Sequence, residues 1–205
     1  MSQSIENKMV SRIYGNKRGW VFTPDCFYDL GSRVAVAQSL VRLAKSGTIR
    51  RLARGLYDYP GKHPDFGVLP PNYDRVAQAL VGRGNLKIQP SGAYAANLLG
   101  LTEQVPAKIV FFTDGPNRKV QISKQKIILK RTTPRNMATA GRISGLVIQA
   151  LRYLKQINVD STIITKLKRR LSDEDKNTLM RDIRYAPVWI GNIFRKIQER
   201  EINAH

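Results

Sequence analysis

The stretch GSRVAVAQSLVRLAKSGTIRRLARGLYDY, residues 31–59, predicts a helix that is followed directly by a β-hairpin. Ser32 is a residue type that accepts hydrogen bonds from the free amides at a helix start, and Gly47 is typical of a helix end. Residues 49–59 then form two short strand-like runs that turn near Arg54. We therefore expect an amphipathic helix with a basic two-stranded ribbon behind it. The apolar face of this helix is made by Val36, Leu40 and Leu43.

The residues before this stretch complete a recognisable order of elements. Apolar residues at helical spacing predict a helix ending near Gly15, and a short apolar run at 20–22 predicts a small strand. Thr23 and Pro24 favour the start of a brief helix that reaches about Leu30. Helix, strand, helix, turn, helix and hairpin is the order of a winged helix-turn-helix. A three-helix bundle that carries a hairpin is the alternative.

The remainder of the chain predicts an α+β protein with a second domain. We expect a winged helix-turn-helix domain in residues 1–60, a Pro-rich connection in 61–72 and a C-terminal domain in 73–205. Three apolar runs between 108 and 130, separated by turn residues, predict a small antiparallel sheet. Helical patterns follow as a bundle, the first of them one long helix from 134 to about 154.

The charge of the chain indicates a polyanionic partner. The 205 residues include 35 Lys and Arg and 15 Asp and Glu, for a net charge of +20. Residues 1–60 contribute +6, residues 61–107 only +1 and residues 108–205 a further +13. Nucleic acid is the leading partner class. The alternative is a protein that is simply basic.

The composition argues against several other classes. One cysteine and two histidines do not suit a disulfide scaffold, a multi-cysteine zinc site or a histidine-based catalytic triad. There is no run of 18 apolar residues and no apolar signal-peptide core at the N-terminus, so we expect a cytoplasmic protein without a membrane span. P-loop and dinucleotide-binding motifs are absent. We therefore expect no enzyme activity, no metal and no cofactor.

The candidate DNA-binding residues lie on the predicted helix, on the hairpin and in two turns. Arg can donate two hydrogen bonds to guanine and Gln can pair with adenine, whereas a helix start suits phosphate. On the hairpin, strict alternation would place Arg50 and Arg54 on one face and Arg51 on the other, so not all three can touch DNA if the ribbon is regular. We expect Arg51 and Arg54 to contact phosphate or the minor groove, and Arg50 is the weaker candidate. The alternative is the solvated face of an ordinary helix. The full set is Lys17, Arg18, Thr23, Ser32, Arg33, Gln38, Arg42, Lys45, Arg50, Arg51 and Arg54.

A second candidate surface, for a polyanion or an acidic partner, lies in the C-terminal domain. Basic residues are dense where the sheet leads into the bundle, and a solvated face that keeps the protein in solution is the alternative. Small residues after Ser91 favour close helix–sheet packing there. The candidates are Gln89, Ser91, Arg131, Arg135, Asn136 and Arg142.

Several stretches resemble the short AbiEi-like antitoxins of bacterial abortive-infection toxin–antitoxin systems. The longest are QPSGAYAANLLGL at 89–101 and RTTPRNM at 131–137, and the resemblance extends over about residues 19–190. The other stretches are GWVFTP at 19–24, DLGSR at 29–33, RRLARGLYDYP at 50–60, TDGP at 113–116 and APVWI at 186–190.

The resemblance implies a two-part protein. An N-terminal winged helix would bind inverted repeats in its own promoter and repress the operon, and a C-terminal domain would counteract a nucleotidyltransferase-type toxin. Some such pairs work without a stable complex. The alternatives are a protein that binds an RNA target of the toxin and an enzyme that reverses the toxin's modification.

Overall fold

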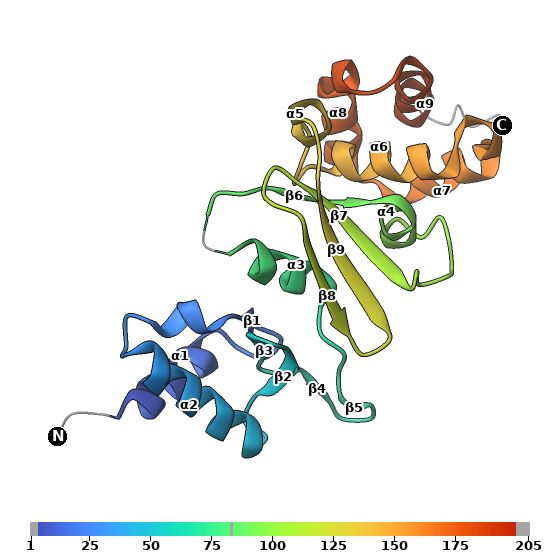
Figure 1. Ribbon diagram of the computed structural model, residues 1–205. Coiled ribbons are helices and arrows are strands. Elements are labelled where there is room, and N and C mark those ends of the chain that lie inside the picture. The colour runs from blue at the N-terminus through green and yellow to red at the C-terminus, as the bar shows by residue number, and fades with distance from the viewer. Residues whose placement is uncertain (1–3, 83, 200–205) are drawn as a thin grey trace. The chain divides into compact units, whose positions relative to one another are not determined.

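The computed structural model describes residues 4–82 and 84–199, which form helices and small sheets in two compact units (Figure 1). Of the described residues, one unit holds 4–82, 84 and 120–124, and the other holds 85–119 and 125–199. The predicted α+β class is confirmed. Residues 61–72, which the sequence predicts to be a connection between domains, are part of the first unit.

The first unit begins with the elements that the sequence predicts, except that the brief helix from Pro24 is a 3₁₀ helix that ends at Phe27 and does not reach Leu30. Ser4 and Ser32 each accept a hydrogen bond from a backbone amide three residues on, which caps the two main helices. Gly55 has a φ of 70°, the left-handed conformation that lets the hairpin turn tightly. The elements are α1 (Ile5–Gly15), β1 (Val21–Phe22), the 3₁₀ helix η1 (Pro24–Phe27), α2 (Arg33–Lys45), β2 (Arg50–Ala53), β3 (Leu56–Asp58), β4 (Lys62–His63), β5 (Gly67–Val68) and α3 (Tyr73–Val81).

The strands of the first unit make a three-stranded antiparallel sheet and a separate two-stranded one. The order is β1-β3-β2, with Arg51 opposite Tyr57 and an irregularity between Arg51 and Ala53. Helices α1 and α2, at the blue end of the ribbon in Figure 1, pack together over one core. The buried side chains of this core are Met9, Ile13, Phe22, Phe27, Val36, Leu40, Leu43, Ile49 and Tyr57.

The second unit combines a sheet with a helical bundle. Its elements are β6 (Ile88–Ser91), α4 (Gly92–Leu98), β7 (Lys108–Thr113), β9 (Gln125–Arg131), α5 (Pro134–Met137), α6 (Ile143–Leu154), η2 (Gln156–Asn158), α7 (Ser161–Arg170), α8 (Asp173–Arg181), η3 (Ile183–Tyr185) and α9 (Val188–Gln198). The same sheet includes β8 (Arg118–Ile122), whose residues 120–122 are grouped with the first unit. Helices α4 and α6 to α9 share one apolar core, and α6 also contacts α4 and β6.

The sheet of this region is mixed, so the expectation that it is wholly antiparallel was wrong. The strand order is β6-β7-β9-β8, in which β6 and β7 are antiparallel but β7 and β9 are parallel. Only two residues join β8 to β9, so these two neighbours form a hairpin. Because β9 lies between β7 and β8, the chain passes over one strand position after β7. Apolar alternation does not distinguish this order from a simple meander.

The long helix expected from 134 to 154 is also corrected by the structure. It is divided into α5 and α6, and the chain between them includes Gly141 with a φ of 78°. A left-handed residue cannot continue an α-helix, so a new helix begins after Arg142. Within the described residues, no helix combines the length and the apolar character that crossing a membrane requires.

Candidate nucleic-acid interface

Helix α2 buries one face and presents the opposite one to solvent. Val36, Leu40 and Leu43 are buried in the first unit, as the sequence predicts. The residues on the opposite side recur at spacings of three and four, which places them on one exposed stripe. This stripe consists of Val34, Gln38, Val41 and Lys45, and we call it the outer stripe of α2.

The start of α2 is ordered by local contacts. The Ser32 Oγ accepts a hydrogen bond from the Ala35 amide at 3.2 Å, and Ser32 itself is exposed. Arg33 is exposed as well, and its guanidinium lies 5.2 Å from the centroid of the Tyr28 ring. Stacking of this kind orients a guanidinium without neutralising it. Ser32 and Arg33 are therefore accessible to a ligand at the helix start.

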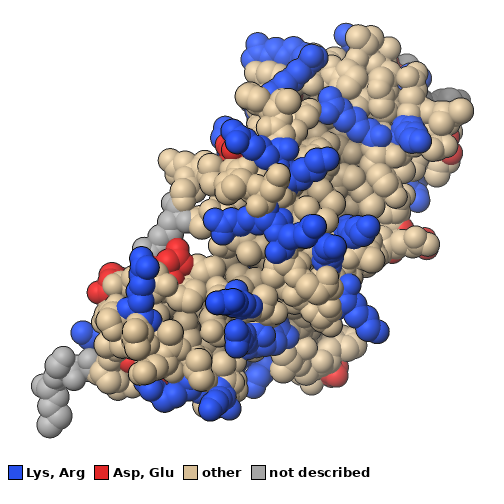
Figure 2. All heavy atoms as spheres, viewed as in Figure 1, with Lys and Arg blue, Asp and Glu red and all other residues tan. Residues whose placement is uncertain are grey.

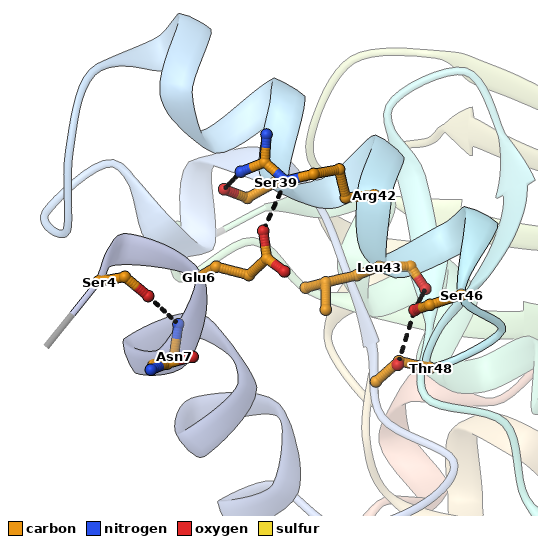
Figure 3. Close-up of polar contacts among 8 residues, drawn as sticks. All are labelled: Ser4, Glu6, Asn7, Ser39, Arg42, Leu43, Ser46 and Thr48. Carbon is orange, nitrogen blue, oxygen red and sulfur yellow. Dashed lines mark hydrogen bonds and ion pairs between the residues drawn. The ribbon is translucent and has the colours of Figure 1, made fainter.

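Arg42, a predicted DNA-binding residue, is bonded to its own unit. Its Nε donates to the Glu6 carboxylate at 2.7 Å and its Nη2 to the Ser39 hydroxyl at 3.1 Å, as Figure 3 shows. Glu6 lies on α1, so the contact ties α1 to α2. Both side chains are partly exposed, where ion pairs contribute little to stability. Arg42 nevertheless has a partner that competes with any phosphate.

The three arginines of the hairpin have different surroundings. Arg50 donates two hydrogen bonds to the Asp58 carboxylate, at 3.1 and 2.6 Å, and one to the Leu69 carbonyl at 3.1 Å. Asp58 is only 1% exposed, so Arg50 is the partner of a buried carboxylate. Arg50 is therefore not one of the accessible candidates for DNA binding. Arg51 and Arg54 are exposed and, among the described residues, their side chains have neither a hydrogen bond nor an ion pair.

The two candidate turns also differ from each other. Lys17 is exposed and holds a φ of 63°, with its amide bonded to the Tyr14 carbonyl at 3.0 Å. Arg18 donates to the Pro60 carbonyl at 3.1 Å and lies over the Tyr59 ring. Thr23 is partly buried and its hydroxyl donates to Asp25. Of these residues, Lys17 is the most accessible. Thr23 has a structural role, because its hydroxyl is bonded within the turn that contains it.

The acidic side chains among residues 4–60 are all occupied by internal contacts. Glu6 and Asp58 pair with Arg42 and Arg50, and Asp25 accepts the Thr23 hydrogen bond. Asp29 pairs with Arg12 at 2.6 Å, a hydrogen bond that raises the pKa of Arg12. The surplus cations are thus not offset locally, and Lys and Arg predominate over Asp and Glu on the face in Figure 2.

Sequence reasoning did not single out two residues of the outer stripe. Val34 is 67% exposed and Val41 is 46% exposed. Their positions relative to Leu40 could have identified them, because an apolar residue on the polar side of a helical pattern has no core to enter. The structure therefore brings accessible cations, an amide and two apolar side chains together on α2.

In the second unit, the proposed partner surface is not continuous. Gln89 and Ser91 are 1% and 6% exposed, so the expectation that they lie on a partner surface does not agree with their burial. Strand β6 places them inside, and a Cβ added to Gly145 would lie 2.4 Å from the Gln89 Oε1. Close packing, the alternative that the small residues favoured, accounts for this site.

The remaining candidates separate into two groups. Arg142 donates to Asp182 at 2.6 Å, and Ser144 donates to the other oxygen of that buried carboxylate. Asn136 instead accepts a hydrogen bond from Arg152 at 2.8 Å. Arg135 lies near enough to Arg152 to lower its pKa, although burial is the larger cause. Arg131 and Arg135 are exposed, and so is Arg142, although Arg142 is bonded to Asp182.

The described residues contain no group of three or more His, Cys, Asp or Glu side chains placed to hold a metal ion. The adjacent acids at the start of α8 form instead a capping arrangement, in which the Asp175 carboxylate accepts from the Ser172 amide at 3.0 Å. These acids therefore stabilise the N-terminus of α8.

Comparison with known proteins gives a family and a distant structural neighbour. A model described as a family of unknown function (DUF6088) matches residues 8–179. No curated protein matches the sequence. The crystal structure of the RV2827C protein from Mycobacterium tuberculosis has a TM-score of 0.47 and 14% sequence identity, over 97% of this chain and 77% of that one.

Proposed function

This chain belongs to the DUF6088 family of unknown function, and we propose that it is a DNA-binding transcriptional autorepressor and antitoxin. The DNA-binding part is a winged helix-turn-helix in which α2 enters the major groove and the β2–β3 hairpin is the wing. The observation that carries the proposal is the exposed, cation-flanked face of α2 followed at once by a hairpin with two exposed arginines, Arg51 and Arg54, which pair with none of the described side chains.

The chemistry of these side chains suits the two tasks of a specific DNA-binding protein. Phosphate contacts give affinity and position the protein, and they would come from Lys17, Arg51 and Arg54. Contacts to base edges give specificity, and Arg33 and Gln38 have the donors and acceptors for guanine and adenine. All five side chains are exposed. A twofold operator would bind two copies of the chain.

The antitoxin part of the proposal rests on the resemblance to AbiEi-like antitoxins. In it, the second unit counteracts a nucleotidyltransferase-type toxin, with or without a stable complex. The exposed cations Arg131 and Arg135 support a contact with an acidic or polyanionic partner. Co-expression with such a toxin tests this part: growth should be restored by the chain, and unrestored growth would contradict it.

A mobility-shift titration tests the DNA-binding part. The full-length protein is titrated on the duplex upstream of its own coding region at physiological salt, with a scrambled duplex and total tRNA as competitors. We expect a discrete complex that survives tRNA and does not form on the scrambled duplex. Equal binding to all three would contradict sequence-specific DNA binding, and stronger binding to tRNA would favour the alternative of an RNA-binding protein.

A further inference from the structure

Two apolar side chains on α2 have no role in the core of their unit. Val34 and Val41 are 67% and 46% exposed, and they share the outer stripe with Gln38 and Lys45. The core-facing side of the same helix is buried at Leu40 and its neighbours. The exposed valines therefore stand on the side of the helix that points away from the apolar core.

Helix stability does not account for these valines. A β-branched side chain loses rotamer freedom in a helix, and valine is a weaker helix former than alanine. A solvent-facing valine also leaves its methyl groups in contact with water. Polar residues would suit this stripe better in an isolated unit, which points to a surface that becomes covered.

We propose that Val34 and Val41 contact the C5-methyl groups of thymines in the major groove and thereby help to select the operator. The inference rests on the proposed function and adds residues that read bases through apolar contact. Thymine is the base whose major-groove edge carries a methyl group, and apolar side chains recognise it there. Gln38 lies between the two valines and can pair with an adenine in the same site.

The surroundings of the stripe favour DNA over a second copy of this chain. Cations flank it at both ends, Arg33 near the helix start and Lys45 at its end. The acidic side chains of residues 4–60 are engaged in internal contacts, so a second copy that met this stripe through its own residues 4–60 would bring cations to it. A groove lined by phosphates complements that charge, and its floor supplies the methyl groups.

The spacing of the valines defines the expected site. They lie seven positions apart, which corresponds to about 10 Å along a helix that rises about 1.5 Å per residue. Bases on one strand are about 3.4 Å apart along the duplex. Each half-site should therefore contain two thymines about three base pairs apart when the helix follows the groove.

The test replaces thymine by deoxyuridine, which removes only the methyl group. High-affinity duplexes are first selected from a random pool with the full-length protein, and each thymine of the selected half-site is then replaced singly. Loss of one buried methyl should weaken binding about fourfold. Val34→Ala and Val41→Ala should each abolish the sensitivity at one thymine, and Val188→Ala, an exposed valine on α9, should leave it unchanged.

The outcomes separate the inference from the function on which it rests. Specific binding that is insensitive to deoxyuridine overturns the thymine contacts and leaves the DNA-binding proposal standing. The absence of any selected sequence overturns both. A change of oligomeric state in Val34→Ala or Val41→Ala, measured by light scattering without DNA, would assign the stripe to a contact between copies and overturn the inference. Circular dichroism of each variant confirms that it is folded.

Discussion

The hairpin shows how much the surroundings of a single residue decide its role. Arg50 and Arg51 are adjacent and chemically identical, yet Arg50 is bonded to the buried Asp58 and Arg51 has no partner among the described residues. A buried carboxylate that loses its partner keeps the cost of its own desolvation. Arg50 therefore has a structural role, whereas Arg51 is available to a ligand.

Arg50→Ala should lower the free energy of unfolding by about 3 kcal/mol, because it leaves the Asp58 carboxylate buried without its guanidinium. Arg51→Ala is the matched control on the next residue and should change stability by less than about 0.5 kcal/mol. Urea unfolding of the full-length protein, followed by circular dichroism, measures both. Equal stability of the two variants would contradict a structural role for Arg50.

Gly145 illustrates the same dependence on packing in the second unit. A Cβ at this position would lie 2.4 Å from both the Gln89 Oε1 and the Thr139 carbonyl oxygen. The backbone carbonyl cannot move as freely as a side chain, so Gly145→Ala should destabilise the protein by about 1–3 kcal/mol. Thermal unfolding measures the effect, with Gly15→Ala, where a Cβ meets no atom within 4 Å, as the control. An unchanged Tm for Gly145→Ala would refute the close packing.

At the scale of the element, α2 has one buried side and one exposed side, and we propose that the exposed side binds DNA. Its capped start and its buried face follow from local sequence, and they hold the outer stripe in one geometry. The contact between Arg42 and Glu6 adds a link to α1 from outside the helix. The exposed side can therefore vary in sequence without loss of the fold, which is the property that a specificity surface requires.

Arg33→Ala and Gln38→Ala should each weaken binding to the selected operator by about 1–3 kcal/mol and leave binding to random duplex nearly unchanged. The reason is that these side chains read bases, whereas phosphate contacts supply the affinity for any sequence. Fluorescence anisotropy on both duplexes measures the difference. An equal loss on the operator and on random DNA would assign these residues to the backbone instead.

At the scale of the whole molecule, the charge of +20 makes salt the decisive variable for any binding measurement. The surplus cations in residues 4–60 lie beside acids that are already paired. Arg12, Arg42 and Arg50 are bonded to these acids, so fewer cations of residues 4–60 are available to a ligand than a count of Lys and Arg suggests.

The affinity for DNA should fall steeply with salt. About six phosphate contacts correspond to a log–log slope near −5. Arg51→Ala and Arg54→Ala should each reduce that slope by about one and weaken binding to all sequences, because each removes one phosphate contact. Titrations between 50 and 300 mM salt measure the slope. A slope that does not change in either variant would show that the hairpin does not touch the phosphate backbone.

The sequence by itself determined the local elements of this protein. Periodicity predicted α1 and α2, turn chemistry predicted the hairpin around Gly55, and side-chain caps marked the start at Ser32, because these signals act over a few residues. They likewise sufficed for the α+β class.

Only the tertiary structure decided which candidates are accessible and how the strands are ordered. Arg42 meets a glutamate 36 residues away and Arg142 an aspartate 40 residues away, and no local pattern predicts such pairs. The parallel pairing of β7 with β9 leaves the same alternation as an antiparallel one, so the sequence could not distinguish them. The burial of Gln89 could not be predicted from the sequence either. Burial depends on which segments pack against a residue, and those segments are distant in the sequence.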